Sequence, residues 1–137
     1  MANGTKTTNL SLANLTAALL AYTSRPRYVG WGIGTTTPAV TSVDLSSPGA
    51  HEARTTGTDT AVQTVAVGDT YQIVAQITCL TAGKAITEVS WWDTADSGPW
   101  ETPAGNLCGL SVFLAINVLV NDSVTFTIKI VYSDNST

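Results

Sequence analysis

The sequence predicts one all-β domain, an antiparallel β-sandwich of about seven to eight strands preceded by a short N-terminal helix. Apolar residues occupy every second position in three long segments, residues 71–79, 108–118 and 124–132. That period is typical of a strand with one buried face. Turn residues separate these segments from shorter ones of similar pattern, at 28–33, 52–56, 60–67 and 86–92. Many short strands between turns indicate a sandwich or a barrel.

One helix is predicted ahead of the strands. Its apolar positions recur at helical intervals of three and four residues, namely Leu12, Leu15, Leu19 and Tyr22. Thr8 or Asn9 can cap its start, and Pro26 stops it. A length of 137 residues fits a single domain. We therefore expect residues 1–26 to form an N-terminal arm and helix, and residues 27–137 to form the sandwich.

The alternation also assigns an inward face to each long segment. In the segment 108–118 this face comprises Cys108, Leu110, Val112, Leu114, Ile116 and Val118. Cys79 lies on the inward face of the segment 71–79. Because cysteine is among the most buried residue types, we expect two buried free thiols. A disulfide between facing strands is the alternative.

Two turns share one pattern. Residues 67–71 and 120–124 both read as an apolar residue, Gly or Asn, Asp, a hydroxyl residue and then the start of a strand. Gly-Asp and Asn-Asp pairs supply the backbone freedom and side-chain hydrogen bonding that a tight turn needs. We expect both turns to connect one strand to the next.

The segment 34–50 is long for a loop in a compact domain. It is rich in Thr, Ser and Pro and carries one charged residue, Asp44. Val40, Val43 and Leu45 could attach it to a neighbouring protein by adding a strand to a sheet edge. A loop that lies on its own domain is the alternative, and the sequence leaves both open.

Charged residues make up only 12% of the chain, about half the usual share. A chain so poor in charge usually covers part of its surface with a partner. The net charge of −4 and the scattered basic residues argue against nucleic acid as that partner. No apolar run approaches the roughly 20 residues of a membrane span, so we expect no membrane association.

The sequence offers little for catalysis, and we expect a protein that is not an enzyme. His51 is the one histidine, and no nucleophile motif surrounds any serine. Carboxylates near the tryptophans (Glu88, Asp93, Asp96 and Glu101) could act in glycoside hydrolysis, but so few acids leave little room for a substrate cleft. A non-catalytic sugar-binding surface is more plausible.

Metal ions and cofactors are not expected either. The two cysteines are about 29 residues apart and lack zinc-site spacing. Asp93, Asp96 and Glu101 lack the regular spacing of a calcium loop. The glycines of residues 30–34 could suggest a phosphate loop, but that motif needs a following helix, and Thr and Pro follow here. We expect these glycines to share one strand face that lets another group approach closely, with Val29, Trp31 and Ile33 on the other face.

The segment 28–35, YVGWGIGT, resembles the YVGWGTGT opening of small virion proteins of tailed bacteriophages. Further blocks resemble the same proteins in the same order, at 52–58, 69–74, 86–93, 105–107 and 122–126. The similarity extends from Arg27 over nearly the whole chain. One departure is Ser90-Trp91-Trp92, where the family has Gly-Leu-Phe.

Such proteins are capsid cement or decoration proteins, or tail-fibre-like proteins. The resemblance implies a β-sandwich that forms homotrimers or docks on the capsid lattice, without catalytic residues or a cofactor. It implies the phage major capsid protein as partner, assembly in the bacterial cytoplasm and a final location on the capsid exterior. The alternative is a tail or tail-fibre component that binds a host surface glycan through Trp91, Trp92 and Trp100.

We expect the partner contacts on the N-terminal helix, the segment 34–50 and the tryptophan-rich segment. Tryptophan is enriched at the energetic centres of interfaces. The candidate interface residues are Leu12, Leu15, Leu19, Tyr22, Trp31, Val40, Val43, Leu45, Trp91, Trp92 and Trp100.

Overall fold

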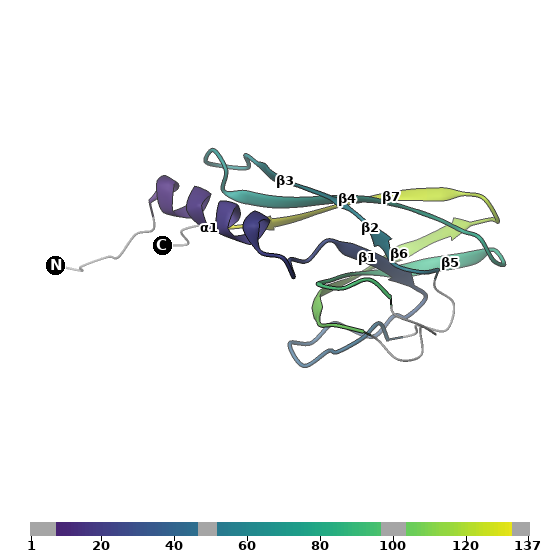
Figure 1. Ribbon diagram of the computed structural model, residues 1–137. Helices are drawn as coiled ribbons and strands as arrows, with labels where there is room; N and C mark the ends of the chain where they lie inside the picture. The colour runs from purple at the N-terminus through teal and green to yellow at the C-terminus, as the bar shows by residue number, and fades with distance from the viewer. Residues whose placement is uncertain (1–7, 47–51, 97–103, 133–137) are drawn as a thin grey trace.

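The computed structural model describes residues 8–46, 52–96 and 104–132, and the structural statements below concern those residues. They form one helix and seven strands in two antiparallel sheets, as the sequence predicts (Figure 1). The elements are α1 (Asn9–Ala21), β1 (Tyr28–Gly32), β2 (Thr55–Thr56), β3 (Thr58–Val62), β4 (Thr70–Thr78), β5 (Lys84–Trp92), β6 (Leu107–Val118) and β7 (Ser123–Val131).

The two sheets face each other as the layers of a sandwich. The first has the strand order β2-β1-β5-β6 and the second the order β3-β4-β7. Gly57 alone separates β2 from β3, and its N–H donates to the carbonyl oxygen of Arg27 at 2.7 Å. This short crossing places β2 and β3 on one side of the sandwich. The edge strands β6 and β7 therefore lie together on the other side.

The core fills the space between the sheets with the inward faces that alternation predicts. Tyr71, Ile73 and Ile77 of β4 are at most 1% exposed, and Trp31 of β1 is fully buried opposite them. The Trp31 ring contacts Phe126 of β7 edge to face, with centroids 6.4 Å apart. Glycines 30 and 32 point to the outer face of β1, also as predicted.

The helix α1 covers the part of the second sheet that the first sheet leaves open (Figure 1). The Thr8 hydroxyl caps it by accepting from the backbone N–H of Ser11 at 3.3 Å. Leu12 and Thr16 are buried beneath it, and Leu19 packs against the core. Within the described residues, no helix has both the length and the apolar character needed to cross a bilayer.

The expected face of the longest segment was wrong in part. Cys108 is exposed and free, Leu114 is 92% exposed, and Leu110 and Val112 pair with Ser90 and Glu88 of the outer face, although strict alternation places all four inside. Ile116 lies opposite the buried Ile86 but is 39% exposed. The reason is two register shifts in the pairing of β5 with β6, which change which residues of β6 face inward. Phe113, expected outside, consequently packs against the core. Cys79 is buried and free, as expected.

Two of the shorter strands also differ from their predicted bounds. The segment 52–56 contributes only Thr55–Thr56 to a strand, and ahead of them the backbone N–H of Arg54 donates to Asp96 Oδ2 at 2.5 Å instead of to a neighbouring strand. The segment 60–67 begins earlier, at Thr58, and ends at Val62. Residues 64–66 turn around the carboxylate of Asp69, which withdraws their N–H groups from the sheet.

The two predicted turns have matching geometry. Gly68 and Asn121 both have a positive φ, of 73° and 76°. The aspartate that follows each of them accepts backbone N–H groups, but the number differs. Asp69 accepts three, from residues 64, 65 and 66, and also the Thr70 hydroxyl at 2.8 Å, whereas Asp122 accepts the N–H of Leu119 at 2.8 Å. These bonds hold the pKa of Asp69 well below its usual range.

The difference between the two turns predicts unequal mutational effects. Asp69→Ala is expected to lower the Tm by several degrees more than Asp122→Ala, because it leaves three backbone donors without their acceptor. Thermal unfolding followed by circular dichroism measures both. The dependence of stability on acidic pH gives a second readout. Because the pKa of Asp69 is lowered in the folded protein, its ionised carboxylate stabilises the fold above the unfolded pKa. This stabilisation is lost as the pH falls. Equal Tm losses for the two variants would contradict the role assigned to Asp69.

Candidate functional site

The outer face of the first sheet carries a buried polar cluster built on the glycine strand. Glu88 of β5 pairs with Gly32 of β1 and is fully buried. A Cβ atom at Gly32 would lie 2.4 Å from Glu88 Oε1, and one at Gly34 would lie 2.6 Å from it. The glycines therefore make room for a glutamate side chain. This is the close approach that the sequence predicts, with the approaching group now identified.

Glu88 fastens the long loop to the sheet. Its Oε1 accepts from the backbone N–H of Gly34 at 2.9 Å, and its Oε2 accepts from the N–H and the hydroxyl of Ser46, both at 3.0 Å. The Thr87 hydroxyl donates to the Gly34 carbonyl oxygen at 2.6 Å. Both ends of the segment 34–46 thus lie on their own domain. The fastened ends agree with the alternative of a loop that lies on its own domain, whereas Val40 and Val43 in its middle are exposed.

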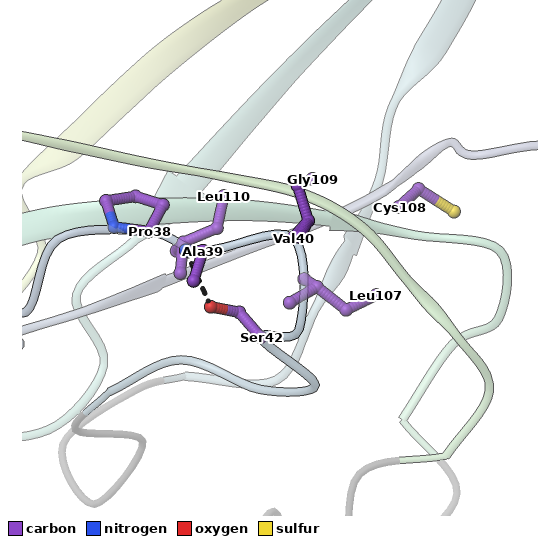
Figure 2. A pocket seen from close by; sticks show the side chains of 8 residues that line it. All are labelled: Pro38, Ala39, Val40, Ser42, Leu107, Cys108, Gly109 and Leu110. Atoms are coloured by element: carbon purple, nitrogen blue, oxygen red, sulfur yellow. Dashed lines mark hydrogen bonds between the residues drawn. The ribbon is translucent and has the colours of Figure 1, made fainter.

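The middle of the loop covers a shallow hollow beside β6. Figure 2 shows loop residues facing β6 residues across this space of about 350 Å³, with the Cys108 thiol pointing away from it. The hollow is lined by Pro38, Ala39, Val40, Ser42, Leu107, Cys108, Gly109 and Leu110. A hydrogen bond from the Ala39 N–H to the Ser42 hydroxyl, 3.0 Å long, shapes the loop there. The described residues that line the hollow include no charged side chain.

A second buried acid, Glu52, joins β1 and β5 of the first sheet to the connection between β4 and β5. Its carboxylate accepts from Trp31 Nε1 at 2.6 Å and from Lys84 Nζ at 2.8 and 2.9 Å. It also accepts the backbone N–H of Leu80 at 3.0 Å and the hydroxyl of Thr81 at 3.0 Å. Burial raises the pKa of Glu52, but the bonds from Lys84, Trp31 and Thr81 outweigh it and lower the pKa to about 2. Both carboxylate oxygens of Glu52 are therefore engaged by groups of the protein itself.

Arg54 lies on the outer face of the first sheet, beside Gly30. Its guanidinium lies 3.6 Å from the centre of the Trp92 ring, and its Nε is 3.0 Å from Asp96 Oδ1. It also donates to the carbonyl oxygens of Thr94 at 3.1 Å and Ala104 at 2.8 Å. Arg54 thus connects the loop after β5 to the segment before β6. Its guanidinium stacks on the Trp92 ring and forms an ion pair with Asp96.

The candidate tryptophans are occupied inside the protein. Trp92 is 1% exposed, stacked by Arg54 and bonded through Nε1 to the Ser90 hydroxyl at 2.8 Å. Trp91 packs against the core and covers Gly109, where a Cβ atom would lie 2.0 Å from its ring. Trp31 is fully buried. Trp31 and Trp92 therefore present no open ring face to a sugar, Trp91 is partly buried, and Trp100 lies outside the described residues.

The remaining candidates for chemistry are engaged or not described. Asp93 accepts the backbone N–H and the side-chain amide of Asn106, both at 2.7 Å. Burial raises the pKa of Asp93, but these bonds lower it on balance. Among the described residues no group of three or more side chains is arranged to hold a metal ion. His51 and Glu101 lie outside the described residues.

The candidate contact residues on the helix and the loop divide into buried and exposed sets. Leu12 and Leu45 are buried at 7% and 6% exposure, so they support the fold and are not available to a partner in this conformation. Leu19 is half-buried against the core. The exposed set comprises Leu15, Tyr22, Val40 and Val43.

An uncharged apolar surface remains on the outside of α1. Leu10 is 72% exposed, Leu15 48% and Tyr22 59%, and alanines together with the exposed Ser11 and Asn14 lie between them. The helix contains no charged residue. Beside it, the turn at Gly68 approaches Ala13 and carries two further exposed valines, Val65 and Val67. We call Leu10, Leu15, Tyr22, Val65 and Val67 the α1 surface. Large apolar side chains that gather on an uncharged exposed surface often mark an interaction site.

The sequence did not reveal the roles of Glu52, Glu88 and Arg54. One signal was available for Glu88, since a charged residue within an apolar strand, opposite a strand with alternating glycines, indicates a side chain that needs that space. No comparable signal marked Glu52. Comparison with protein-family models finds no match to this chain, and comparison with curated proteins finds none either.

Proposed function

We propose that this chain is a non-enzymatic structural protein of a tailed-bacteriophage virion, a capsid cement or decoration protein that binds and stabilises the major-capsid lattice as a homotrimer. The observation that carries the proposal is the α1 surface, an exposed apolar patch without charge on a chain whose buried acids all serve its own fold. The resemblance of the segment 28–35 and the later blocks to phage virion proteins supplies the partner.

Burial of the α1 surface would stabilise the assembled shell. Apolar area removed from water contributes about 25 cal/mol per Å² before the costs of association. A clamp of this kind needs a rigid scaffold more than a reactive group, and the sandwich with its fastened loop provides one. The glycan-binding alternative has less support, because Trp91 and Trp92 are occupied by packing and by Arg54.

The test uses shells assembled from the major capsid protein of the phage that encodes this chain. Added protein is expected to raise the melting temperature of the shells by several degrees in calorimetry and to give cryo-EM density on their outer surface. Leu15→Glu is expected to weaken binding at least tenfold, because it places a charge in the apolar contact. Gln76→Glu, which adds the same charge to the exposed outer face of the central strand β4, is the matched control. Density on the tail with none on the shell would refute the proposal.

A further inference from the structure

The side of the sandwich formed by β6 and β7 has two open edges. Both strands are the last in their sheets, and no described strand pairs with their outer sides. An edge strand presents backbone donors and acceptors that can pair with another chain. Here the core is also partly accessible between the edges, where Phe113 of β6 and Phe126 of β7 are in contact with ring centroids 6.1 Å apart and are each half-buried.

The β6 edge lacks the charges that usually protect an edge strand, whereas β7 carries the exposed Lys129. The segment 106–121, which contains β6, has no Asp, Glu, Lys or Arg and no proline. Soluble proteins commonly place Lys or Pro on an exposed edge to prevent pairing. The two register shifts bend β6 but leave it apolar. Exposed side chains gather toward its end, where Leu114 is 92% exposed, Leu119 72% and Val120 48%.

The size of this side matches one half of an ordinary protein interface. β6 has 12 residues, which at about 3.3 Å each span about 40 Å. Two sheets about 10 Å apart, with their side chains, give the side a height of about 20 Å. The product, about 800 Å², equals the area that each partner contributes to an interface of standard size.

We infer that the β6–β7 side is the self-association surface of this protein and that its occupant is a second copy of the same chain. A copy of β6 offers a strand of equal length, equal lack of charge and complementary unpaired backbone groups, so a symmetric assembly covers the open edge of β6 in each copy. The inference specifies the self-association included in the proposed function. It is tested on the purified chain alone, so its failure would leave the capsid-binding proposal to its own test.

The experiment measures the mass of the purified protein in solution by light scattering after gel filtration. The wild-type chain of 14.3 kDa is expected to run as a dimer or trimer, and Leu114→Lys as a monomer. Leu114 is exposed in the single chain, so the lysine should leave the fold intact, which circular dichroism checks. Thr60→Lys, at an exposed residue of β3 on the other side of the sandwich, is the control and should keep the wild-type mass.

Hydrogen exchange supplies a second, residue-level readout. Amides of β6 are expected to exchange at least tenfold faster in Leu114→Lys than in the wild type, because the outer edge loses its cover, while β4 amides at the centre of its sheet stay unchanged. A monomeric wild type at micromolar concentration would overturn the inference. An unchanged mass for a folded Leu114→Lys, or equal β6 exchange in the two proteins, would overturn it as well.

Discussion

Replacing Glu52 with alanine is expected to reduce the free energy of unfolding by about 3–5 kcal/mol, among the largest effects of a single substitution in this chain. The reason is the ammonium group of Lys84, which is 8% exposed at its side chain and would stay buried without its carboxylate. Trp31 Nε1 would also lose its acceptor inside the core. Urea unfolding followed by tryptophan fluorescence measures the loss.

A double-mutant cycle separates the ion pair from the rest of the Glu52 network. Lys84→Met keeps the length of the side chain and removes its charge. We expect Glu52→Ala and Lys84→Met together to cost about 1–3 kcal/mol less than the sum of the two single substitutions, because the double variant leaves no buried charge unpaired. Additive losses would show that Glu52 and Lys84 do not act as a pair.

Acid titration tests the same network in the wild-type protein. The folded pKa of Glu52, about 2, lies below its ordinary value of 4.5. The ionised carboxylate therefore stabilises the fold above pH 4.5, and this stabilisation is lost as the pH falls from 4.5 toward 2. The slope of stability against pH in that window should be smaller in Glu52→Gln, which cannot titrate.

The second large loss of stability is expected at Gly32 of β1, which faces Glu88. Gly32→Ala is expected to cost about 3 kcal/mol, because the new Cβ atom would lie 2.4 Å from Glu88 Oε1 and 3.0 Å from its Cγ and Cδ. Glu88 would have to move, and the bonds to Gly34 and Ser46 that fasten the loop would break.

The neighbouring glycine provides a matched control on the same face of the same strand. A Cβ atom at Gly30 would meet the Arg54 and Ser90 side chains at 3.4 Å, a distance close to ordinary contact. Gly30→Ala should therefore change the free energy of unfolding by less than about 1 kcal/mol. Urea midpoints of both variants decide the matter, and proteolysis within residues 35–46 reports the release of the loop. If both substitutions have the same cost, the close approach of Glu88 is not what requires glycine.

Local sequence patterns predicted the inward faces of the strands whose pairing is uninterrupted. The alternation in 71–79 and 124–132 predicted the inward faces of β4 and β7, because an uninterrupted strand turns each successive side chain to the opposite side. The same rule failed for β6, where two register shifts interrupt the ladder. Nothing in the sequence of 108–118 marks those shifts, since they arise from fitting β6 against β5.

The sequence by itself therefore determined that this protein is a sandwich with one leading helix, a glycine strand built for close approach and two matching turns. Only the tertiary structure decided what approaches the glycines, which acids hold strands and loops together, and which apolar residues stay outside. The physical reason is the separation along the chain over which each kind of interaction acts. Alternation, capping and turn geometry act between residues that are near in sequence, whereas the Glu88–Gly34 and Glu52–Lys84 bonds join positions 54 and 32 residues apart.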